Sequence, residues 1–86
     1  MASVAEVRAA IDAAIQQVNE SQAAISEATE KISEAQVSLG AALDGSAHES
    51  TAAAYASLAQ ATSDLENCLA ATHAAVEQAQ TYTATL

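Results

Sequence analysis

The chain has 86 residues, enough for one domain, and about half are hydrophobic, but most of these are alanine. Two Tyr and no Phe or Trp are present, so large apolar side chains are too scarce to fill a thick globular core. Eleven acidic residues oppose two basic ones, and a net charge of −9 excludes nucleic-acid or anionic-lipid binding through a basic patch.

The residue types indicate an all-α protein. Alanine, glutamine, glutamate and leucine dominate, all strong helix formers, and proline is absent. No run approaches the roughly 18 apolar residues of a membrane span, and no basic segment followed by an apolar one marks a secretory signal. We therefore expect a cytoplasmic location, with export by a signal-peptide-independent route as the alternative.

The first helix is expected over about residues 3–43. The sequence SVAE offers Ser3 as the N-cap and Glu6 as the third helical residue, which together form a capping box. Gly40 is a possible earlier end, because glycine inside a helix costs about 1 kcal/mol relative to alanine. Good helix formers follow Gly40, and they favour continuation to Leu43.

Large aliphatic residues recur every seven positions in this helix. Such a repeat predicts lengthwise packing against a neighbouring helix with a left-handed supercoil. Ile15 and Leu43 widen the apolar stripe. The aliphatic positions are Val4, Ile11, Val18, Ile25, Ile32 and Leu39. We expect the small residues three positions further on to complete the seam: Val7, Ala14, Ser21, Ala28, Ala35 and Ala42.

The segment LDGSAHES, residues 43–50, interrupts the helical pattern at the midpoint of the chain. Asp44 and Gly45 are typical of a turn, and Gly45 suits the left-handed conformation that ends many helices. Ser46 and Glu49 repeat the capping-box spacing. The segment predicts a turn over 44–46 and a second helix over about 47–84.

The second helix carries the same repeat with smaller residues. Tyr55, Leu69 and Val76 broaden its stripe. The seven-residue row is Leu58, Leu65, Thr72, Ala79 and Leu86. The expected seam partners three residues on are Ala61, Cys68, Ala75 and Tyr82.

Folding the chain about Asp44 and Gly45 makes two arms of equal length. Antiparallel pairing then joins residues whose numbers sum to about 90, such as Val18 with Thr72. We therefore predict that residues 1–86 form a single antiparallel two-helix hairpin, coiled-coil-like, with an alanine-rich seam. The predicted interface residues are Val4, Ile11, Val18, Ile25, Ile32, Leu39, Leu58, Leu65, Leu69, Val76 and Leu86.

A hairpin of this composition buries only one stripe on each helix. Cores of this size seldom supply more than about 3–5 kcal/mol of stability. Because the stripe is wider than one partner helix needs, we expect dimerisation into a four-helix bundle, or pairing with another helical hairpin protein.

Few residues suggest chemistry. His73 and Glu77 share a helical face, which suits a metal ligand pair or an ordinary solvated pair. Cys68 at a seam position is typical of a small buried residue and has no positioned base nearby. Glu20, Glu27 and Glu34 form a row that is either a solvated face or a docking strip for a basic protein surface. We predict no catalytic residue, cofactor or metal, and no enzyme.

The plan resembles the Trp-x-Gly family of small helical hairpins exported by type VII secretion systems. Leu43-Asp44-Gly45 occupies the place of the Trp-x-Gly turn, with Leu for Trp. The family's export signal, a Tyr followed four residues later by an acid, is not met, because Leu86 follows Tyr82 at that interval. The resemblance implies a dimer that acts as a secreted adaptor or effector partner.

Together these features favour a non-enzymatic, acidic helical interaction module that acts by homo- or hetero-oligomeric helix packing. The alternative is a small secreted hairpin of the type VII kind. A partner gene beside this one would favour the secreted class.

Overall fold

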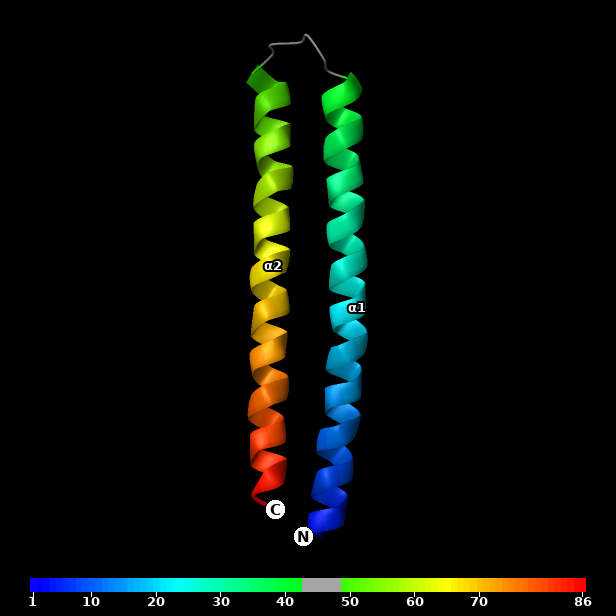
Figure 1. The fold of residues 1–86 in the computed structure, drawn as a ribbon, viewed down its shortest axis with the longest axis vertical. Helices are drawn as coiled ribbons and strands as arrows, with labels where there is room; N and C mark the ends of the chain where they lie inside the picture. Colours follow the sequence, from blue (N-terminus) through cyan, green and yellow to red (C-terminus); the bar gives the residue numbers. More distant parts are fainter. Residues whose placement is uncertain (43–48) are drawn as a thin grey trace.

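Two long antiparallel helices make up the fold (Figure 1). The structure, a computed structural model, describes residues 1–42 and 49–86. Helix α1 spans Val4–Ala42 and α2 spans Glu49–Ala84, which confirms the all-α hairpin. The molecule is a rod with extents of 64 × 18 × 15 Å. The predicted turn residues Asp44, Gly45 and Ser46, and Leu43 before them, lie outside the described residues.

Helix α1 begins where its cap predicts. The backbone N–H of Glu6 donates to Ser3 Oγ at 3.1 Å, and the N–H of Val7 donates to the Ser3 carbonyl at 3.0 Å. The first bond satisfies an amide that has no partner within the helix, so Ser3 is confirmed as the N-cap.

Gly40 does not end α1. The helix continues through this residue to Ala42. A Cβ placed on Gly40 would meet nothing within 4 Å, so no close neighbour requires glycine there. Helix continuation is explained by Ala41 and Ala42, which are the best helix formers available.

The C-terminal end of α2 is tightened by short-range bonds. The N–H groups of Thr85 and Leu86 donate to the carbonyls of Tyr82 and Thr83, at 3.0 and 3.1 Å. These three-residue bonds satisfy carbonyls that the α-helical pattern leaves free at its last turn.

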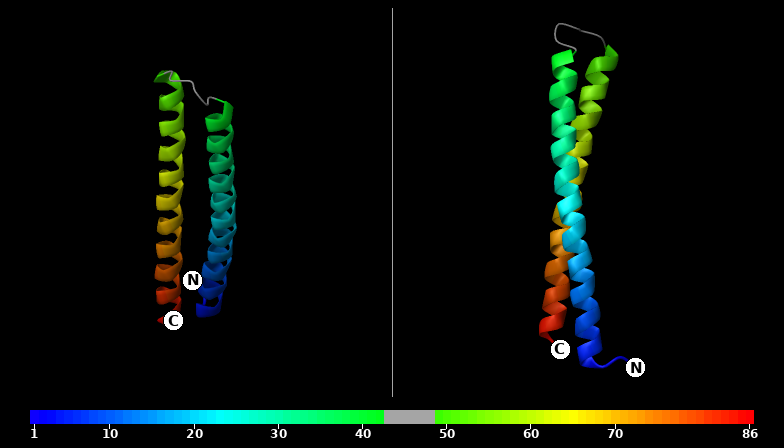
Figure 2. Two further views of the ribbon diagram at one scale, coloured as in Figure 1. Left: turned by 45° about the horizontal axis from the view of Figure 1, so that its top comes forward. Right: turned by 90° about the vertical axis from the view of Figure 1, so that its right-hand side faces the viewer.

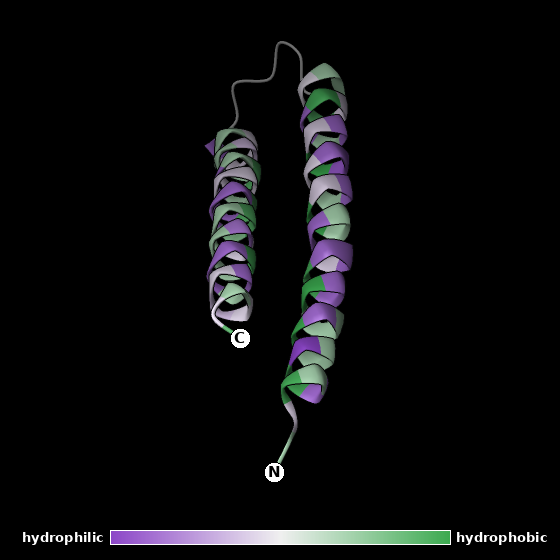
Figure 3. Cartoon of the chain, turned by 60° about the horizontal axis from the view of Figure 1, so that its bottom comes forward, coloured by the Kyte–Doolittle hydropathy of each residue, from purple (hydrophilic) through white to green (hydrophobic). Residues whose placement is uncertain are grey.

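The helices lie side by side along their whole length and cross at a shallow angle (Figure 2). Hydrophobic and hydrophilic segments alternate along both, as a helix with one inward stripe requires (Figure 3). The inward stripe is the contact face, and it consists of two rows of half-buried residues on each helix.

On both helices the first row is the predicted seven-residue repeat. In α1 it is Ile11, Val18, Ile25, Ile32 and Leu39. In α2 it is Leu58, Leu65, Thr72 and Ala79, and Leu86 continues the row just beyond the end of the helix. The second row lies four residues further on, not three as expected. It is Ile15, Gln22, Thr29 and Gln36 in α1, and Thr62, Leu69, Val76 and Thr83 in α2.

Most of the small residues expected at the seam are therefore exposed. Ala14, Ser21, Ala35, Ala42, Cys68, Ala75 and Tyr82 are all exposed, whereas Val7, Ala28 and Ala61 are half-buried. The expectation was wrong because it ranked alanine above threonine and glutamine as a seam residue. Apart from Val4, which is 53% exposed, every predicted interface residue is half-buried.

Candidate interaction surfaces

A polar layer crosses the middle of the contact face. The Gln22 side-chain amide donates from Nε2 to Thr72 Oγ1 at 3.2 Å, and it lies 3.3 Å from His73 Nδ1. The Thr72 hydroxyl in turn donates to the Leu69 carbonyl at 2.7 Å. Gln22 and Thr72 are half-buried, so this bond partners polar atoms that would otherwise lose water.

The Gln22–Thr72 bond gives one cross-helix side-chain pair. Their numbers sum to 94, whereas the sequence led us to place Thr72 opposite Val18. If this sum holds along the rod, Ile25 faces Leu69 and Val18 faces Val76. Each first-row residue then faces a second-row residue of the other helix, which is the interlocked arrangement of antiparallel helices. The expected pairing differs because it matched first row with first row.

Threonines on the contact face satisfy their hydroxyls on their own helix. Thr29, Thr62 and Thr83 donate to the carbonyls four residues earlier, at 2.9, 3.2 and 2.9 Å. Each hydroxyl is partnered without the other helix, which leaves the methyl group free to pack. Threonine thus acts as a small apolar residue here, a role that hydrophobic patterning does not reveal.

Two flanks border the contact face, and they differ in charge. Because the helices are antiparallel, the rows one residue before each second row come to the same side of the hairpin. These rows form the neutral flank. In α1 they are Val7, Ala14, Ser21, Ala28, Ala35 and Ala42, and in α2 they are Ala54, Ala61, Cys68, Ala75 and Tyr82. No charged residue belongs to either row.

The rows one residue after each first row form the opposite side, the acidic flank. In α1 they are Ala5, Asp12, Asn19, Ser26, Ser33 and Gly40, and in α2 they are Ala52, Ala59, Glu66, His73 and Gln80. Glu30 and Glu77 in the adjoining rows add further negative charge, whereas Lys31 and Asp64 beside the neutral flank have opposite signs. The two sides of the hairpin are thus electrostatically distinct.

The glutamate row of α1 lies on the side away from α2. Glu20, Glu27 and Glu34 are exposed, and helical geometry places them opposite the contact face. They take no part in holding the hairpin together. The row is therefore accessible as a solvated face or as a strip for a basic surface.

Cys68 is exposed, and it lies midway along the neutral flank. The expectation that it is a buried seam residue was wrong, because the row three residues after the first row lies beside the seam. Tyr82, on the same flank, is 53% exposed, and Tyr55, in the first turns of α2, is 48% exposed.

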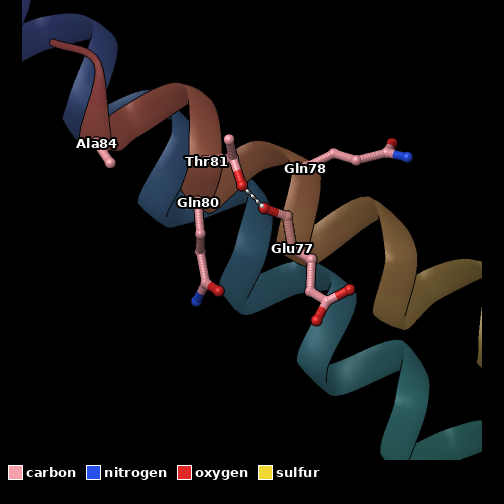
Figure 4. A pocket seen from close by; sticks show the side chains of 5 residues that line it. All are labelled: Glu77, Gln78, Gln80, Thr81 and Ala84. Carbon is pink, nitrogen blue, oxygen red and sulfur yellow. Dashed lines mark hydrogen bonds between the residues drawn. The ribbon is translucent and has the colours of Figure 1, made fainter.

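The larger surface hollow described is formed by one helix alone. This hollow, about 750 Å³, is lined by Glu77, Gln78, Gln80, Thr81 and Ala84, all from α2 (Figure 4). The Thr81 hydroxyl donates to the Glu77 carbonyl at 2.8 Å, and the longer side chains point outward into solvent. Within residues 1–42 and 49–86 no three His, Cys, Asp or Glu side chains gather as a metal site.

Neither described helix combines the length and apolarity that a bilayer span needs. Comparison with known proteins adds no relative, since no family model, curated protein or solved structure matches the chain. The resemblance to Trp-x-Gly hairpins stays a prediction.

Proposed function

We propose that this protein is a non-enzymatic interaction module that acts by packing its helices against another helical chain. The observation that carries the proposal is the incomplete core. No residue in the described part of the chain is buried, even though most of the large aliphatic residues belong to one contact face. Such a face is normally completed by further helices.

The exposed area supports the same conclusion. The chain exposes 6009 Å², whereas a compact monomer of its 8.7 kDa mass would expose about 4,700 Å². A thin rod has a large surface for its volume, and this excess is the area from which an interface can be drawn. A partner that covers one side of the rod would convert the half-buried contact face into a core.

The partner that fits is a second copy or another helical hairpin, because a rod 64 Å long is matched best by a rod of similar length. The exposed glutamate row of α1 adds a further candidate contact for a basic protein surface. Export by a type VII-like route is a separate proposal. A gene for a second helical hairpin beside this one would favour it over action inside the cell.

Sedimentation of the purified protein over a concentration series, together with circular dichroism, tests the proposal. A dimer at low micromolar concentration, or a partly helical monomer that gains helix when a partner binds, is the expected result. A fully helical monomer that unfolds cooperatively at high temperature, at every concentration, would show that the hairpin needs no partner.

A further inference from the structure

We infer that the neutral flank is the surface on which a second copy of this chain packs, so that two hairpins form a four-helix bundle. The inference rests on the proposed function and specifies the face and the occupant. The neutral flank adjoins the contact face on both helices, and Val7, Ala28 and Ala61 within it are already half-buried. It therefore widens the apolar stripe to the breadth that a helix with two neighbours has.

Charge selects this side over the other. Each copy carries a net charge of −9, so two copies repel, and the repulsion is smallest where the surfaces that meet carry no charged row. Contact through the acidic flanks would oppose Asp12 and Glu66 of one copy to the same residues of the other. Contact through the neutral flanks brings no charged row together, and it keeps the glutamate row of α1 at the outside.

The available area is sufficient for a stable dimer. The flat side of the rod measures 64 by 18 Å, which corresponds to at most about 1,150 Å² on each copy. A standard interface needs about 800 Å² from each partner. The small side chains along the flank allow the helices of two copies to approach closely, which increases the number of packed atoms.

Matched charge substitutions test the face. Ala35→Glu with Ala75→Glu places two carboxylates on the neutral flank. Ala23→Glu with Ala59→Glu places one on the acidic flank, at residue 59, and one in the row beside it, at residue 23. All four alanines are exposed, and both variants change the net charge equally. We expect the first pair to raise the dimer dissociation constant, measured by sedimentation, more than about a hundredfold, because its carboxylates are desolvated in the interface. The second pair should change it less than about threefold.

The reactivity of Cys68 provides an independent test of the interface in the unmodified protein. It is exposed in the single hairpin and lies on the neutral flank, so dimerisation should shield its thiol. We expect the rate of reaction with a bulky thiol reagent to fall more than about tenfold as the protein concentration passes the dissociation constant.

The possible outcomes distinguish a failure of the neutral-flank assignment from a failure of the proposed function. A dimer that survives the neutral-flank substitutions, or that leaves Cys68 fully reactive, overturns the face assignment while association by helix packing stands. A wild-type protein that stays monomeric but gains helix with a different hairpin overturns the second copy as occupant and keeps the proposed function. Circular dichroism of both variants at equal concentration establishes that each still folds.

Discussion

The layer of Gln22 and Thr72 divides the hairpin into a turn-side half and an open half, and the two differ in the side chains that α2 contributes. The pairing sum of 94 brings Leu58, Leu65 and Leu69 to the turn-side half. The open half receives Val76, Ala79, Thr83 and, at the very end of the chain, Leu86. Helix α1 supplies aliphatic residues to both halves. The difference in side-chain size between the halves therefore comes mainly from α2.

This difference shows that one seven-residue repeat can include regions whose packing contributes unequally to the stability of the hairpin. Larger side chains remove more apolar area from water, at roughly 25 cal/mol for each Å². Chain ends also fray more readily than the middle of a helix. We therefore expect the turn-side half to unfold last, and the open half to exchange its amide hydrogens first.

Truncating one isoleucine in each half gives the largest expected effect. Ile25→Ala should lower the free energy of unfolding by about 2 kcal/mol, toward the low end for buried aliphatics because Ile25 is only half-buried. Ile11→Ala, opposite Thr83 near the open end, should cost about 1 kcal/mol. Urea unfolding followed by circular dichroism measures both, and equal losses would contradict the unequal halves.

Removing the cap weakens the open half. Ser3→Ala deletes the hydroxyl that accepts the Glu6 amide at 3.1 Å, and it should cost about 1 kcal/mol. Hydrogen exchange should rise in the first turns of α1 and stay unchanged around Ile32. Ala2→Ser, next to the cap, is a control expected to have no effect. Uniformly faster exchange along α1 would mean that the hairpin opens as one unit.

Strengthening the turn-side half is the opposite change. Gly40→Ala should raise the free energy of unfolding by about 0.8 kcal/mol, because alanine favours the helix and its Cβ meets no atom within 4 Å. Gly40 lies on the acidic flank, so the substitution should leave the dimer dissociation constant unchanged. A loss of stability in thermal unfolding would show that the backbone at this residue is not an ordinary helix.

The smallest expected effect tests the pairing itself. A double-mutant cycle between Ile25→Ala and Leu69→Ala should give a coupling energy of about 0.5 kcal/mol, since the sum of 94 makes these residues partners. The cycle between Ile25→Ala and Leu65→Ala, which the sum of 90 would pair, should give a smaller one. A larger coupling to Leu65 would restore the pairing first expected from the sequence.

The sequence alone determined the class, the hairpin, the Ser3 cap and the first row of the contact face. These follow from local properties, because helix propensity, capping and the spacing of large aliphatic residues act within a few turns. A hydrophobic pattern cannot rank small and polar candidates, however, so it placed Ala14 and Cys68 at the seam.

The second row, the Gln22–Thr72 pair and the exposed position of Cys68 came from the packing of the two helices. Gln22 belongs in the seam because Thr72 on the other helix accepts its hydrogen bond, and that partner is 50 residues away in the chain. The flanks likewise exist only once two antiparallel helices bring their rows to the same sides. Which residues pair, and which rows face each other, depends on how the two helices are placed. The seven-residue repeat within one helix is compatible with several such placements.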